Sequence, residues 1–151
     1  MIKIPFHISK YGLITAQLFL INSFVCYIYF YKILSYFLFV LYITTLLHWK
    51  NLKKHSIIKY LDILVSLLTI IRITFFDSNN FILYHKTIWC IYMIFIFFIF
   101  IINEYLFYIF SNNIFDTNNK YPIIYFINVF IHLFFLHVIT NILCIYFIIK
   151  K

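Results

Sequence analysis

The chain has 151 residues, of which 66% are hydrophobic, 25% aromatic and only 11% charged. A water-soluble domain of this size needs far more polar surface, so the composition excludes one and indicates that lipid surrounds most of the chain. The net charge of +8 is typical of basic residues that flank membrane segments, and we expect the lipid bilayer, not nucleic acid, as the partner. The excess of Phe, Ile, Tyr, Asn and Lys also suggests an A+T-rich genome.

Five apolar stretches predict an all-α fold, a polytopic bundle of transmembrane helices that forms a single integral membrane domain over residues 1–151. The predicted spans cover residues 13–31, 33–49, 57–76, 87–110 and 123–149, each close to the ~20 residues that cross a bilayer. The first two have no Pro or Gly between them, so a tight hairpin competes with one long bent helix, which would leave four spans. Lys32 favours the hairpin, because a Lys in the middle of a buried helix is costly.

Basic residues predict the orientation. Lys3, Lys10 and the loop at residues 50–55 lie on one side of the predicted topology, which favours a cytoplasmic or matrix N-terminus. Lys150 and Lys151 at the other end point the opposite way.

The first apolar stretch lacks a small-residue cleavage site, so we interpret it as a retained anchor. The cysteines fall in three different spans without CxxC spacing, which argues against a disulfide framework. With one Gly and one Ala, we expect no small-xxx-small packing motif.

Two carboxylates, Asp62 and Glu104, lie inside predicted spans, where a charge costs at least a few kcal/mol. We expect histidines of neighbouring spans as their partners. A rise of ~1.5 Å per residue places both acids ~8–9 Å from the inner surface, near the level of His48. In the last span, His132 lies at a similar depth and His137 lies deeper. Two further polar candidates are Thr44, one helical turn from His48, and Ser66, one helical turn from Asp62. Three other histidines lie outside the spans and are predicted to be solvated, namely His7, His55 and His85.

The order Thr44-xxx-His48, then Asp62, then His132 and His137 resembles the membrane hydrolase superfamily that includes alkaline ceramidases and the adiponectin-receptor family. The resemblance implies a zinc ion on the three histidines, with Asp62 positioning a metal-bound water and Thr44 in place of the family's serine. Zinc bound in this way activates water to attack a lipid-like amide or ester. The family has seven spans and a His-xxx-His pair.

The spacing of the last two histidines departs from that pattern. His132 and His137 are five residues apart, about 140° around an ideal α-helix, so only one of them would face a common site. A local π-bulge would bring both to one face.

The residues leave two other function classes open. The first is a non-catalytic accessory subunit of a larger respiratory or organellar membrane complex, which fits the short loops. The second is a proton or ion pathway through Asp62, Glu104 and the histidines. Structural roles are also open: His48 as an interfacial anchor beside Trp49, an ion pair between Asp62 and its neighbour Lys59, and the last two histidines as hydrogen-bonded glue between helices.

Overall fold

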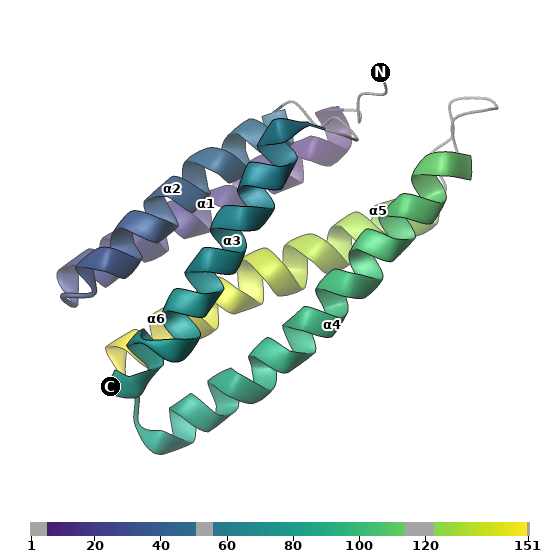
Figure 1. The fold of residues 1–151 in the computed structure, drawn as a ribbon. Helices are drawn as coiled ribbons and strands as arrows, with labels where there is room; N and C mark the ends of the chain where they lie inside the picture. The colour runs from purple at the N-terminus through teal and green to yellow at the C-terminus, as the bar shows by residue number, and fades with distance from the viewer. Residues whose placement is uncertain (1–5, 51–55, 114–122, 151) are drawn as a thin grey trace.

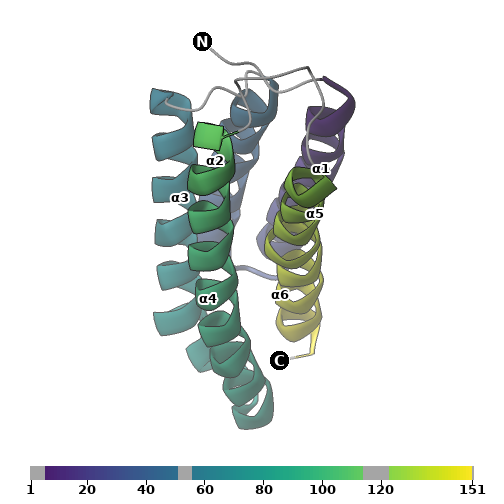
Figure 2. The same ribbon diagram turned by 90° about the vertical axis from the view of Figure 1, so that its right-hand side faces the viewer.

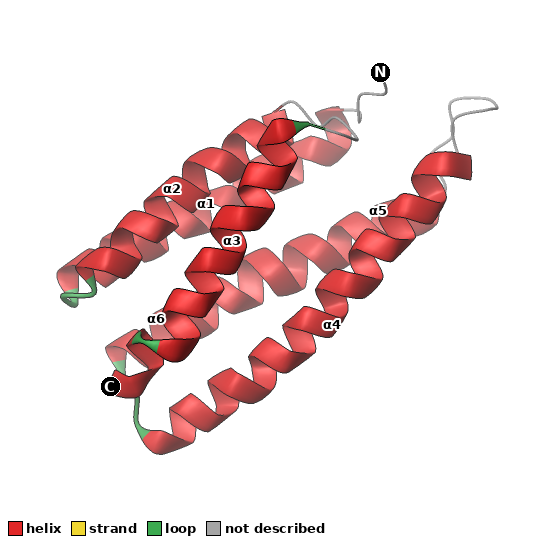
Figure 3. Cartoon of the chain, viewed as in Figure 1, coloured by secondary structure: helices red, strands yellow, loops and turns green. Residues whose placement is uncertain are grey.

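The computed structural model describes residues 6–50, 56–113 and 123–150, and side chains within 9–50, 56–106 and 126–150. This part of the chain is helical throughout, apart from short turns (Figures 1 and 3). The all-α prediction is therefore confirmed. The elements are α1 (Phe6–Ile28), α2 (Lys32–Lys50), α3 (Ile57–Phe75), a 3₁₀ turn η1 (Asp77–Asn80), α4 (Leu83–Asn113), α5 (Ile123–Ile131), a π-helix η2 (His132–Ile139) and α6 (Thr140–Ile149).

Four of these helical segments are long and apolar enough to cross a membrane: Ser9–Ile28, Lys32–Lys50, Leu83–Leu106 and Phe126–Ile149. The last segment joins α5, η2 and α6, which follow one another without a break as one rod (Figure 1). Large apolar side chains are exposed along the helices, for example Leu83 at 77% and Phe24 at 63%. Such surfaces suit lipid, and the four helices are compatible with a small membrane protein. The third predicted span forms α3, which matches α2 in length but carries Lys59, Asp62 and Arg72.

α1 and α2 form the tight hairpin favoured by Lys32, and not one bent helix. The turn lies slightly earlier than predicted, because Phe30 adopts a positive φ of 67° and the Tyr31 N–H donates to the Cys26 carbonyl at 2.8 Å. Lys32 then begins α2 with an exposed side chain. A Phe with a left-handed backbone conformation is unusual, and the sequence, which has no Gly at this point, does not predict one. Farther along, α3 begins at an N-cap, where the Ser56 hydroxyl accepts from the Lys59 N–H at 3.1 Å.

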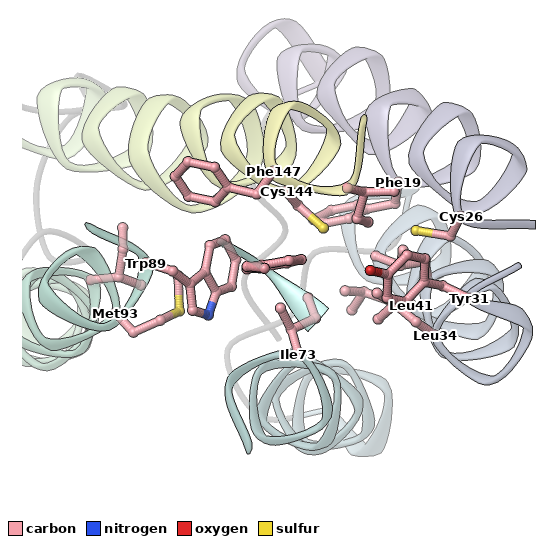
Figure 4. Close-up of a cluster of buried hydrophobic side chains, with 14 residues drawn as sticks. Phe19, Cys26, Tyr31, Leu34, Leu41, Ile73, Trp89, Met93, Cys144 and Phe147 are labelled. Atoms are coloured by element: carbon pink, nitrogen blue, oxygen red, sulfur yellow. The ribbon is translucent and has the colours of Figure 1, made fainter. Parts of the chain in front are cut away.

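A central apolar cluster joins all the long helices (Figure 4). Trp89 of α4 and Phe147 of α6 are almost fully buried in it, together with Phe19 of α1, Leu34 of α2 and Ile73 of α3. Viewed from the side, α3 and α4 stand opposite α1 and the α5–α6 rod, with α2 behind (Figure 2).

The only glycine, Gly12, and the only alanine, Ala16, lie four residues apart on the buried face of α1. The expectation that the chain has no small-xxx-small motif was therefore wrong. A Cβ on Gly12 would overlap the indole ring of Trp49, which lies in the last turn of α2. The glycine is required here because the ring of one helix lies directly against the backbone of the other.

Candidate functional site

A π-helix brings His132 and His137 together. In η2 the Thr140 N–H bonds to the Phe135 carbonyl, five residues back instead of four. This wider turn places residues i and i+5 on one face, and the two imidazole centroids lie 5.2 Å apart. The local π-bulge that the five-residue spacing requires is thus present. His137 is buried and His132 half-buried.

Each of these histidines has a hydrogen-bond partner on another helix. His132 Nδ1 lies 2.7 Å from Asn103 Nδ2 of α4, and His137 Nδ1 lies 3.0 Å from Thr15 Oγ1 of α1. The Thr15 hydroxyl also lies 3.2 Å from the Gly12 carbonyl, to which it donates. The pair therefore ties the last rod to α1 and α4, which agrees with the predicted role as hydrogen-bonded glue between helices.

Trp49 lies at the centre of the three histidines that the zinc hypothesis uses. Its ring contacts those of His48, His132 and His137 at centroid distances of 5.6, 5.9 and 6.2 Å. Trp49 is only 4% exposed, so its ring packs inside the bundle, whereas His48 is half-buried. Neither His48 Nδ1 nor Trp49 Nε1 has a hydrogen-bond partner among the described residues.

The donor set does not fit a zinc ion. Among the described residues, no three His, Cys, Asp or Glu side chains are grouped so that they could hold a metal. Asp62 is bonded to threonines of α2 instead. The three-histidine ligand set implied by the resemblance is therefore not assembled, and we derive no chemistry from it.

Asp62 is held by two threonines of α2. Thr44 Oγ1 donates to Asp62 Oδ1 at 2.9 Å, and Thr45 Oγ1 donates to the same oxygen at 2.7 Å. The structure thus brings the predicted residues Thr44 and Asp62 together, whereas the expected histidine partner of Asp62 is replaced by hydroxyls. Ser66 lies half-buried one turn farther along α3.

Glu104 pairs with Lys59, not with a histidine. Lys59 Nζ and Glu104 Oε2 lie 2.8 Å apart, with side chains 13% and 35% exposed. The ion pair links α3 to α4, and it also replaces the Lys59–Asp62 pair considered from the sequence. Because Glu104 follows Asn103, the ion pair lies beside the partner of His132.

The other end of the bundle holds a second ion pair. Arg72 Nε and Nη2 donate to the two carboxylate oxygens of Asp77 at 3.1 Å each. Burial raises the pKa of the Asp77 carboxyl above its usual value, and the guanidinium offsets part of this rise.

His85, which was predicted to be solvated, is 9% exposed in α4, so that prediction was wrong. The side chain of His7 and all of His55 lie outside the described residues.

Several polar residues of the site were not singled out in the sequence, although each interrupts an apolar helix: Thr15, Thr45, Tyr92 and Asn103.

Comparisons with protein-family models, with curated proteins and with solved structures find no significant match to this chain.

Proposed function

We propose that this membrane protein conducts protons, with the His132–His137 pair as its proton-binding site inside the bundle. The observation that carries the proposal is the π-helical turn, which brings the two imidazoles to 5.2 Å. Imidazole exchanges protons near neutral pH more readily than any other unperturbed side chain. Ionisable groups buried at membrane depth commonly mark proton relays, and π-helical turns are frequent at functional sites.

The hydrogen bonds of the pair assign complementary tautomers. The Asn103 amide N–H donates to His132 Nδ1, which leaves the proton of that ring on Nε2. The Thr15 hydroxyl donates to the Gly12 carbonyl and so accepts from His137 Nδ1–H, which leaves a lone pair on His137 Nε2. One ring of the pair is then a donor and the other an acceptor at Nε2. A proton enters His132 at Nδ1, the one lone pair of that ring, once the Asn103 amide turns to present Oδ1 to it. The Nε2 proton of His132 can then pass to the Nε2 lone pair of His137.

Polar side chains continue from the pair in both directions. On one side, Asn103 is followed by the partly exposed Glu104. On the other side, Asn141 Nδ2 donates to the His137 carbonyl at 2.7 Å, and Asn22 Nδ2 donates to Asn141 Oδ1 at 2.9 Å. Cys26 Sγ follows, 3.4 Å from Asn22 Oδ1. Buried donors and acceptors of this kind supply sites that bridging water can bond.

Proton flux into liposomes tests the proposal. The purified protein is reconstituted with an internal pH-sensitive dye, and a potassium diffusion potential drives protons inward. We expect flux above that of empty liposomes, and its loss in a His132→Gln/His137→Gln double variant. His85→Gln is the matched control, because it removes a buried histidine of α4 outside the pair. Equal flux in the double variant and the wild type, or wild-type flux no higher than that of empty liposomes, would contradict the proposal.

A further inference from the structure

The π-helix that pairs the two histidines has an external support on α4. Tyr92 OH donates to the Phe135 carbonyl at 2.8 Å and lies 3.2 Å from Thr140 Oγ1. Thr140 Oγ1 itself lies 2.9 Å from the same carbonyl. Two hydroxyls from two segments of the chain therefore meet at one backbone oxygen in the middle of η2.

The Phe135 carbonyl is one of those that would have a different partner in an α-helix. In an α-helix, the Phe135 oxygen would accept from the N–H of Ile139, whereas here it accepts from the Thr140 N–H. π-helical bonding is less favourable than α-helical bonding unless other contacts support it. The Tyr92 and Thr140 hydroxyls add such contacts at the Phe135 oxygen, which lies between His132 and His137 in the chain.

We infer that Tyr92, assisted by Thr140, is a positioning residue that holds η2 in its π-helical form and thereby keeps His132 and His137 paired. The functional consequence rests on the proposed proton conduction, but the geometric consequence does not. Without the Tyr92 hydroxyl, the segment gains freedom to return to α-helical bonding. The histidines would then be separated by about 140° around the helix, and the relay between them would break.

Disulfide formation measures this geometry directly. In an α-helix, Cα atoms five residues apart are separated by about 8.6 Å, from the rise and radius of the helix. A disulfide requires less than about 7 Å. We therefore propose a His132→Cys/His137→Cys chain in lipid nanodiscs, oxidised with copper phenanthroline, with the bond located by fragment-ion mass spectrometry. Mapping separates the 132–137 bond from any bond to the native Cys144.

The parent chain is expected to form the 132–137 disulfide, and Tyr92→Phe and Thr140→Val are each expected to reduce its yield several-fold. Thr140→Ser keeps the hydroxyl and should retain the yield. Tyr105→Phe is the matched control, because it removes an exposed tyrosine hydroxyl from the same helix. Melting temperatures of all variants show which of them remain folded. Thr140→Val keeps the test decisive if Tyr92→Phe does not fold.

A second measurement uses the chain with its native histidines. Tyr92→Phe should lower proton flux and displace its pH profile, whereas Tyr105→Phe should leave both unchanged. Undiminished crosslinking in Tyr92→Phe, or no 132–137 bond in the parent, would overturn the inference. A crosslink that depends on Tyr92 in a protein without flux would instead leave the positioning role standing and remove the proposed function.

Discussion

Trp49 of α2 lies against the backbone of α1 at Gly12, so closely that a Cβ on this glycine would overlap the indole ring. In an unconstrained helix, Gly→Ala is stabilising by about 1 kcal/mol. At this position, overpacking should outweigh that gain by costing about 1–3 kcal/mol. We expect Gly12→Ala to lower the free energy of unfolding in detergent, as measured by denaturant titration of helical circular dichroism.

A double-mutant cycle isolates the contact. In a Trp49→Ala background the ring is absent, so Gly12→Ala should become neutral or stabilising. A similar loss in both backgrounds would show that the glycine serves some purpose other than accommodating Trp49.

The two threonines on Asp62 form a second measurable unit. Thr44→Val and Thr45→Val each remove one hydrogen bond to the same carboxylate oxygen, and interhelical bonds of this type contribute about 0.6–2 kcal/mol. We expect the double variant to lose more stability than the sum of the two, because Asp62 would lose both hydroxyl donors at once. Unfolding free energies of the three variants test this.

Asp62→Asn supplies the control. The Asn carbonyl can still accept from both hydroxyls, so the change removes the charge and keeps the bonds. It should preserve the stability that the Thr44→Val/Thr45→Val double variant loses. If Asp62→Asn is as damaging as that double variant, the charge itself is required.

The ion pair between Lys59 and Glu104 connects α3 with α4. Lys59→Glu and Glu104→Lys each place like charges opposite one another, so each should reduce the yield of folded protein, measured by size-exclusion chromatography after membrane extraction. The exchanged pair, with both substitutions, should recover most of that loss. No recovery in the exchanged pair would indicate that other contacts of these residues decide the outcome.

Helix content and approximate span limits were predictable, because long apolar runs between polar breaks leave few alternatives in lipid. The shared level of Asp62, Glu104 and His48 also followed from helical rise alone. Side-chain pairing did not, since a rise fixes depth and not which neighbouring helix a residue faces. Asp62 therefore accepts hydrogen bonds from threonines, and Glu104 forms an ion pair with Lys59, rather than either contacting a histidine.

The sequence did not predict that a π-helix forms; it showed only when one would be needed. The five-residue spacing of His132 and His137 requires it if both rings face one site, but nothing local to residues 132–139 indicates that it forms. Its support comes from Tyr92 on another helix. The close contact of Trp49 with Gly12 is likewise tertiary, and the positive φ of Phe30 contradicts the local preference of that residue.

Asp77 gives the bundle a pH dependence whose sign can be worked out. Burial raises the pKa of its carboxyl, so the folded protein binds this proton more tightly than the unfolded chain does. The contribution to stability is therefore complete below the unfolded pKa of about 3.9, and it is lost as the pH rises through the folded pKa. We expect the melting temperature of the wild type, relative to that of Asp77→Asn, to fall as the pH is raised from about 3.5.

The comparison with Asp77→Asn separates this group from the other carboxylates, which titrate in both proteins. Asn keeps one acceptor for Arg72 and cannot ionise, so its melting curve lacks the Asp77 contribution. A difference between the two proteins that instead grows in favour of the wild type with rising pH would mean that the paired guanidinium outweighs burial. The Arg72 bonds to both carboxylate oxygens would then hold the pKa of Asp77 below its usual value.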